Sequence, residues 1–253
     1  MPGLPPVVLV PGRSHPGPPP SSSGASRYPS GSTGYDISWP QCGQSYPPQP
    51  YTVAIVGVND GQAFSANPCL GSESAWAGSG INLYININSP SSDDATDQSG
   101  PAGQCAPGEN ACLAYNYGYN AAANSVAMAA NQGVRAPTWW LDVETAGSCT
   151  SQFPTKGTGY WSCETPLNAR TVQGAIDALR QAGVTPGDYS TSYQWGVITG
   201  GYVPSGGSVP NWIAGADPSQ TSSWCSGSHD FGGGRPWLLQ LATSASYDQD
   251  QAC

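Results

Sequence analysis

The chain has 253 residues and a net charge of −9, and only 9% of its residues are charged. With 38% hydrophobic residues it can bury one sizeable core, and a barrel of this length is normally a single domain. Seven basic against sixteen acidic residues argue against nucleic acid or an anionic membrane as a partner.

The beginning of the chain differs in composition from the rest. Residues 1–33 are rich in Pro, Ser and Gly and are expected to form a disordered tail, whereas residues 34–253 are expected to form the folded domain. The first residues do not make a good signal peptide, because their apolar run is short and broken by proline. No segment is long and apolar enough to span a membrane.

Seven short apolar runs follow the tail and predict β-strands. Most are continuously apolar rather than alternating, as expected for strands that are covered on both faces. The runs are YDISW (35–39), TVAIVGVN (52–59), INLYINI (81–87), TWWLDVE (138–144), DYSTS (188–192), NWIAGA (211–216) and PWLLQL (236–241).

Two helices are predicted between these runs. In residues 165–183, Thr165 can cap the helix, a proline follows it, and Gly183 ends the helix. A second helix is predicted within residues 117–133, again closed by glycine. Beyond about residue 188 the helical pattern is weak, so we expect loops to join the last strands.

Strands that alternate with helices predict an α/β fold with a parallel sheet. Seven strands in about 220 residues fit a TIM-like barrel better than a doubly wound sheet. No G-x-G-x-x-G motif follows a strand and the chain has no phosphate-binding loop, so no cofactor is expected.

The eight cysteines predict four disulfides and therefore a secreted protein. No C-x-x-C pair has zinc spacing and the chain has two histidines, so no metal site is expected. The sequence leaves the connectivity open. Pairing of near neighbours gives Cys42–Cys69, Cys105–Cys112, Cys149–Cys163 and Cys225–Cys253.

The chain is rich in aromatic residues, with 9 Trp and 13 Tyr. A weakly charged, aromatic surface suits neutral polymers such as sugars, which bind through ring stacking and hydrogen bonds. Solubility of a secreted protein explains the acidity equally well, and core filling explains many of the rings. Trp39, Tyr193 and Trp195 follow strand ends and are the expected stacking residues.

Two acidic residues close the fourth apolar run. Asp142 and Glu144 are two residues apart, so their side chains lie on one face of a strand with Cα atoms roughly 6.6 Å apart. Repulsion between them and an apolar setting raise the pKa of one, which then carries a proton near neutral pH. Asp36 closes the first run and can reach the same barrel mouth. Glycoside hydrolysis needs such a pair of carboxyl groups.

Five segments resemble, in order, those of the family 25 glycoside hydrolases, the secreted lysozymes that cut peptidoglycan, and more closely a group of related actinobacterial secreted domains. The segments are GYDISWPQ, TWWLDVE, YSTSYQW, NWIAGA and PWLLQL with YDQDQAC, and the resemblance spans about residues 34–253. The matching residues are Asp36, Ser38 and Gln41; Asp142 and Glu144; Tyr189; Trp212 and Ala214; and Trp237, Gln240 and Asp248.

This resemblance implies a flattened (β/α)5β3 barrel that cleaves a cell-wall glycan, with peptidoglycan the first expectation. It implies that Glu144 is the general acid and that Asp142 orients the substrate's own acetamido group, so that no protein nucleophile is needed. Asp36 and Asp248 would tune charge and bind substrate. The other expected substrate-binding residues are Gln41, Trp39, Tyr189, Tyr193, Trp212 and Gln240.

Alternatives remain open. Residues 89–112 and 145–166 are longer than a lysozyme core requires, so a different wall polysaccharide is possible. A catalytically silent glycan-binding domain would keep the same barrel, although three acids at one mouth favour an enzyme. A serine hydrolase is disfavoured, because neither Ser190 nor Ser192 has a plausible histidine partner. We expect a monomer.

Overall fold

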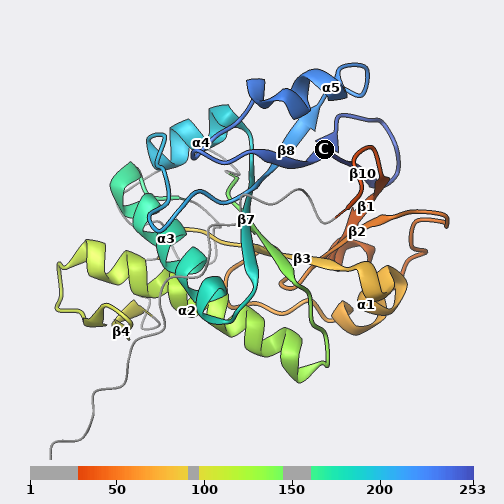
Figure 1. The fold of residues 1–253 in the computed structure, drawn as a ribbon. Helices are drawn as coiled ribbons and strands as arrows, with labels where there is room; N and C mark the ends of the chain where they lie inside the picture. Colours follow the sequence, from red (N-terminus) through yellow and green to blue (C-terminus); the bar gives the residue numbers. More distant parts are fainter. Residues whose placement is uncertain (1–27, 91–96, 145–160) are drawn as a thin grey trace, which may run out of the picture.

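The computed structural model describes residues 28–90, 97–144 and 161–253. Eight strands close into a barrel in the order β1-β10-β9-β8-β7-β6-β3-β2 (Figure 1). All neighbouring pairs are parallel except those of β10, which is antiparallel to both β1 and β9. The strands are β1 Thr33–Ile37, β2 Val53–Gly57, β3 Asn82–Asn86, β6 Thr138–Asp142, β7 Thr185–Ser190, β8 Asn211–Ala216, β9 Pro236–Leu241 and β10 Asp248–Ala252.

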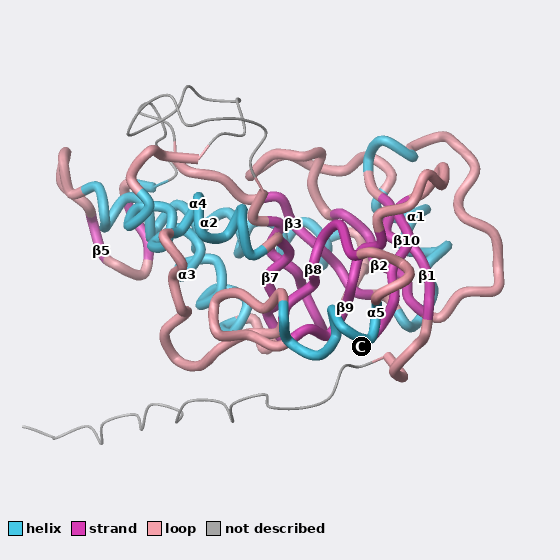
Figure 2. The backbone as a smooth tube through the Cα atoms, turned by 90° about the horizontal axis from the view of Figure 1, so that it is seen from above, coloured by secondary structure: helices cyan, strands magenta, loops and turns pink. Residues whose placement is uncertain are grey.

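A helical element follows each of the first five barrel strands. They are the 3-10 turn η1 Trp39–Gln41, α1 Leu70–Ala77, α2 Asn110–Asn131, α3 Thr165–Gln181 and α4 Ser192–Thr199. Between β8 and β9 there are only α5 Thr221–Ser223 and a π-helical turn, Trp224–Ser228. This arrangement is the (β/α)5β3 barrel that was predicted. Figure 2 shows α2, α3 and α4 gathered on one side of the barrel strands.

Three short elements complete the fold. A 3-10 turn, η2 Gly78–Gly80, leads into β3, and a small hairpin precedes α2. The hairpin consists of β4 Ser99–Gly100 and β5 Gly103–Gln104. Asn116 of α2 lies against the hairpin, and a Cβ at Gly100 would come within 2.6 Å of the Asn116 Oδ1, so this close approach favours glycine at position 100.

The seven predicted strands are confirmed within a few residues. Strand β10 was missed because its sequence, DQDQA, has no apolar run. The expectation of loops alone beyond residue 188 is wrong, because α4 follows β7 directly. Helix α2 begins at Asn110, seven residues before the predicted start. Thr165 is the first residue of α3 and not its cap.

Aromatic side chains fill the barrel interior. Trp140 and Trp212 are both almost fully buried, with ring centroids 6.0 Å apart, and Tyr189 lies 4.4 Å from Trp212. Tyr84 closes the cluster at 6.0 Å from Trp212. Trp139 points the other way and packs in the layer between strands and helices. These rings make the barrel interior mainly apolar below the mouth.

The folded domain begins before the predicted boundary at residue 34. Tyr28 is 7% exposed and packs in the interior cluster. Its hydroxyl donates to the Gly80 carbonyl at 2.7 Å and accepts from the Asn82 amide at 2.6 Å. Residues 28–33 therefore belong to the barrel and not to a tail. Residues 1–27 lie outside the described residues.

Three of the predicted disulfides are confirmed: Cys42–Cys69, Cys105–Cys112 and Cys225–Cys253. The fourth predicted pair, Cys149–Cys163, involves Cys149, which lies outside the described residues. The Cys225–Cys253 bond joins the turn after β8 to the end of β10. Since β10 closes the barrel, this bond holds the closing strand against the neighbouring connection.

Helices α2 and α3 pack side by side through two glycines (Figure 1). A Cβ at Gly118 would lie 1.9 Å from the Thr171 carbonyl oxygen, and one at Gly174 would lie 2.1 Å from the Tyr115 carbonyl oxygen. Both approaches are too close for any side chain. The absence of a side chain at these two positions therefore permits the contact between the two backbones.

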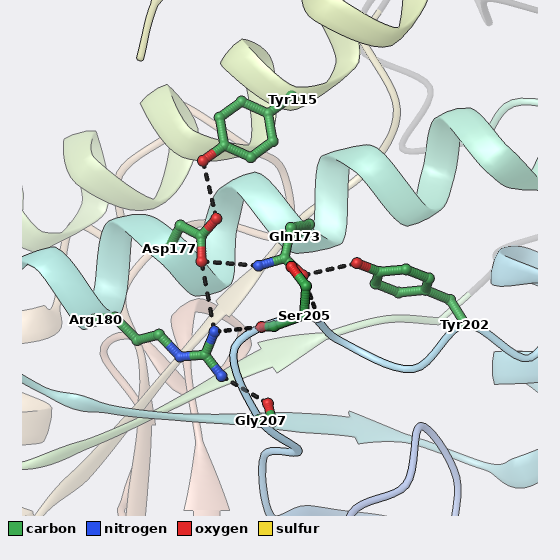
Figure 3. Close-up of polar contacts among 7 residues, drawn as sticks. All are labelled: Tyr115, Gln173, Asp177, Arg180, Tyr202, Ser205 and Gly207. Atoms are coloured by element: carbon green, nitrogen blue, oxygen red, sulfur yellow. Dashed lines mark hydrogen bonds and ion pairs between the residues drawn. The ribbon is translucent and has the colours of Figure 1, made fainter. Parts of the chain in front are cut away.

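A polar network fixes the same pair of helices to the loop that follows α4 (Figure 3). Tyr115 of α2 donates to Asp177 of α3 at 2.9 Å, and Gln173 donates to the other oxygen of Asp177 at 2.8 Å. Arg180 pairs with Asp177 and donates to two loop carbonyls, those of Ser205 and Gly207, each at 2.7 Å. The network orients the two helices with hydrogen bonds as well as apolar contacts.

We predict that Gly118→Ala destabilises the fold by about 2–3 kcal/mol or more, because a new methyl group would push α2 away from α3. Thermal unfolding measures this as a fall in Tm of several degrees. Gly71→Ala is the matched control, because a Cβ there meets only the end of the Gln132 side chain at an ordinary 3.7 Å. Equal Tm values for Gly118→Ala and wild type would contradict the close crossing.

Asp188 of β7 is buried on the outer side of the barrel wall. It is 1% exposed, and neither carboxyl oxygen has a hydrogen-bond partner among the described residues. Its register neighbour Leu141 belongs to the layer between strands and helices. Burial raises the pKa of Asp188 to about 8, although the charge of Arg180 opposes the rise. The folded chain therefore holds a proton that the unfolded chain loses.

We predict that stability falls as the pH rises from about 4 towards 8, because the folded-state pKa of Asp188 exceeds its unfolded value. Asp188→Asn removes this contribution. The difference in Tm between Asp188→Asn and wild type should therefore grow as the pH rises from about 4 towards 8, and then level off. Thermal melts at several pH values test the prediction. The exposed Asp60→Asn variant is the control, and parallel curves for Asp188→Asn and wild type would refute it.

Candidate active site

Four carboxyl groups meet at one end of the barrel. Asp36 lies in β1, Asp142 ends β6, and Glu144 follows two residues later. Strand β10 is antiparallel, so its first residue, Asp248, lies at the carboxyl ends of the parallel strands and pairs in register with Asp36. Asp142 experiences the charges of Glu144 and Asp36, and Glu144 that of Asp248. The mouth therefore combines all the predicted acids.

Asp142 is held by a neighbour in the next strand. The amide of Asn86, its register partner in β3, donates to the Asp142 Oδ2. Asn59 fixes Asn86 in turn through two bonds to its backbone, at 2.9 and 3.1 Å. The other oxygen, Oδ1, is buried and has no hydrogen-bond partner among the described residues. Burial, then the charges of Glu144 and Asp36, raise the pKa of Asp142 well above its ordinary value.

Asn86 was not identified from the sequence. It is the last residue of β3, as Asp142 is the last of β6. In the sequence, however, Asn86 lies inside the apolar run INLYINI and does not close it, so nothing there marked it as a site residue.

Glu144 is held by the helix that follows the next strand. Gln194 of α4 donates to its Oε1 at 3.2 Å, and the Trp161 indole donates to its backbone carbonyl at 2.7 Å. Burial raises the pKa of Glu144 and the charge of Asp248 adds to the rise, whereas hydrogen bonds from Gln194 and Tyr189 oppose it. The upward direction agrees with the prediction, although burial contributes most to it.

A chain of hydrogen bonds links three of the predicted site residues. The Tyr189 hydroxyl donates to Gln240 at 2.7 Å, and the Gln240 amide donates to the Asp36 Oδ2 at 3.0 Å. Burial raises the pKa of Asp36 to about 7, with the Gln240 bond opposing the rise and the charge of Asp248 adding to it. Gln240 therefore connects β1, β7 and β9 across the barrel.

The remaining predicted residues divide into two groups. Trp39 and Tyr193 are 46% and 79% exposed and follow β1 and β7, so their rings are open for stacking beside the mouth. Trp212 is 2% exposed within the barrel. The Gln41 side chain accepts from the Ser38 backbone at 2.9 Å and caps η1. The structure does not bring Trp212 or Gln41 to the open mouth.

Trp195 was expected to stack on a ligand, and this expectation is wrong. It is 1% exposed, and its indole donates to the Tyr202 carbonyl at 2.9 Å. The error arose because α4 was not predicted. Once residue 192 begins a helix, the residue three positions later turns towards the barrel, whereas Tyr193 remains outside.

A separate hollow of about 630 Å³ lies beside α4. It is lined by Trp195, Phe231, Asp230, Arg235 and the backbone of the glycines at 232–234, and by none of the mouth carboxyls. Across residues 28–90, 97–144 and 161–253, no group of three or more His, Cys, Asp or Glu is placed to hold a metal ion. No helix in those ranges is long and apolar enough to cross a membrane.

We predict that Asp142→Asn stabilises the protein at neutral pH by about 1–2 kcal/mol, because the amide removes a buried charge and its repulsion by other acids. Its carbonyl oxygen can still accept from Asn86. Thermal unfolding should show a higher Tm than wild type, with Asp60→Asn as the exposed control. A lower Tm would mean that the carboxylate at position 142 is net stabilising.

Two comparisons of the sequence with known proteins found matches. A family model described as Lysozyme-like protein 1 matches residues 109–233. A probable GH family 25 lysozyme of Dictyostelium discoideum is 34% identical over 101 residues, which cover 40% of this chain but only 18% of that protein. The chain therefore spans only a small part of the length of that relative.

Two solved structures share the fold. A muramidase from Trichobolus zukalii has a TM-score of 0.51 and 15% identity, and a family GH25 lysozyme from Aspergillus fumigatus has a TM-score of 0.52 and 11% identity. Each alignment covers 88% of this chain and 93% of the other. At these identities the two likenesses show a shared barrel fold, and the two sequence matches make the chain similar to lysozyme-like and family 25 proteins.

Proposed function

We propose that the protein is a glycoside hydrolase that cleaves peptidoglycan at the barrel mouth, with Glu144 as the general acid. The observation that carries the proposal is the position of Asp142 and Glu144, two partly buried acids with raised pKa values at the mouth of the barrel. Two of the similar proteins, a probable lysozyme and a muramidase, support the same substrate class.

The unpaired oxygen of Asp142 supports a substrate-assisted mechanism. Its Oδ1 is buried and has no hydrogen-bond partner in the described part of the chain, so an acetamido N–H of the substrate can donate to it. That bond favours the charged form of Asp142 and leaves the shared proton on Glu144. Glu144 then protonates the leaving oxygen, while the acetamido oxygen attacks the sugar carbon.

Asp142 stabilises positive charge as it develops on the ring formed by the acetamido group. Asp36 and Asp248 add negative potential at the mouth, which favours the oxocarbenium character of the transition state. Trp39 and Tyr193 provide exposed rings on which sugar units stack. Hydrogen bonds of Gln240 with Tyr189 and Asp36 hold these side chains in position at the mouth.

We further propose that the protein acts outside the cell as a monomer. Its three described disulfides form in oxidising compartments, and peptidoglycan is reached from outside the membrane. A purified sample should elute at the mass of one chain in size-exclusion chromatography with light scattering.

We predict that Glu144→Gln and Asp142→Asn each lower the clearing of purified cell walls by a factor on the order of 10² or more. Glu144→Gln should be milder on a substrate whose leaving group needs no proton. The exposed Glu164→Gln variant is the matched control. Products identified by mass spectrometry should retain the anomeric configuration, and a fluorosugar should leave no covalent adduct.

Three outcomes would change this proposal in different ways. An adduct on Asp142, or an inverted product, would contradict substrate assistance. Tight glycan binding without any product would favour a catalytically silent binding domain. Release of sugars only from another wall polysaccharide would retain the mechanism and replace the substrate.

A further inference from the structure

A fifth acid lies beneath the mouth, and the function proposed above does not use it. Asp250 is the third residue of β10 and is fully buried. Strand alternation places it on the same face as Asp248, one step deeper in the barrel. The Trp212 indole donates to its Oδ1 at 2.8 Å, so the carboxyl cannot turn away.

The second oxygen of Asp250 faces another carboxyl group. Oδ2 meets no N–H or hydroxyl donor within the described part of the chain. Its neighbour is Asp36 on the paired strand β1: Asp36 is in register with Asp248, and Asp248 and Asp250 share one face of β10. A hydrogen bond between the two carboxyls would lower the pKa of Asp36 and raise that of Asp250. Two carboxyl oxygens attract each other only when one of them carries a proton.

The surroundings decide which of the two acids holds that proton. Asp250 is enclosed by the barrel, and burial and the charges of Asp36 and Asp248 all disfavour its ionised form. Asp36 has a compensating donor, the Gln240 amide at 3.0 Å. The charge of Asp250 would also oppose ionisation of Tyr28 and Tyr189. Asp36 is thus the better acceptor and Asp250 the better donor.

We propose that Asp250 is a protonated positioning residue, whose O–H donates to Asp36, favours the charged form of Asp36 and orients it beneath Asp142 and Glu144. This role rests on the proposed function for its catalytic meaning, but the proton on Asp250 is a property of the folded barrel and can be measured without substrate.

The donor pattern extends from Asp250 to the general acid. A charged Asp36 accepts from both Asp250 and Gln240, which leaves the Gln240 oxygen to accept from the Tyr189 hydroxyl. Tyr189 also interacts with Glu144, and this interaction lowers the pKa of Glu144. Asp250 and Glu144 are therefore connected through Asp36, Gln240 and Tyr189.

The test compares two substitutions of similar size. In Asp250→Asn the amide can still accept from Trp212 and donate to Asp36, whereas Asp250→Leu offers no donor. The titration of Asp36 is followed by carboxyl 13C NMR, assigned with Asp36→Asn. Wild type and Asp250→Asn should share a midpoint of about 7, and Asp250→Leu should move it upward by about one pH unit or more.

Other results would overturn the proposal. A lower Asp36 midpoint in Asp250→Asn would mean that Asp250 is ionised in the wild type, and an unchanged midpoint in Asp250→Leu would mean that it donates nothing. If Asp250→Leu does not fold, the wild-type carboxyl signal of Asp250 decides alone. It should keep the chemical shift of a protonated acid through neutral pH.

Activity gives an independent readout. If the chain is an active hydrolase, the acidic limb of its pH–rate profile should follow the Asp36 midpoint and move upward in Asp250→Leu. If the chain is inactive on every glycan but the NMR midpoints behave as expected, the proposed function fails and the role of Asp250 stands.

Discussion

The structure depends on the closure of the barrel by one polar, antiparallel strand. Strand β10 fills the gap between β1 and β9 and satisfies the backbone groups of both. A parallel strand here would require a further crossover, whereas β9 and β10 are joined by a short connection. Because β10 runs in the opposite direction, the start of this strand reaches the mouth. Asp248 therefore joins acids that come from the ends of parallel strands.

Filling of the interior by aromatic rings determines how these acids behave. Trp140, Trp212 and Tyr189 occupy the space below the mouth, so carboxyl groups above them have apolar walls and few donors. Burial is the first cause of the raised pKa of every mouth acid. Burial of several carboxyl groups lowers the stability of the fold at higher pH. The packing of the outer layer offsets this loss of stability.

Apolar patterns made most of the fold predictable. Seven strands were found because continuous apolar runs are typical of strands covered on both faces, and Asp142 and Glu144 were found because acids interrupt such a run. Strand β10 could not be found this way, since its strand character comes from closure and not from its own residues. Asp250 was missed for the same reason. Roles that depend on neighbours, such as those of Asn86 and Gln41, follow only from the three-dimensional contacts.

The bond from the Trp161 indole to the Glu144 carbonyl has a consequence for how the protein can change. It holds together the two ends of the connection between β6 and α3, so this connection leaves the site and returns to it at fixed points. The entropy of closing a connection grows slowly, by about 0.6 kcal/mol for each doubling of its length. Segments of different length and sequence can therefore replace one another between these anchors without moving the acid. Such replacement would let the surroundings of the mouth diverge while the positions of its carboxyl groups are kept.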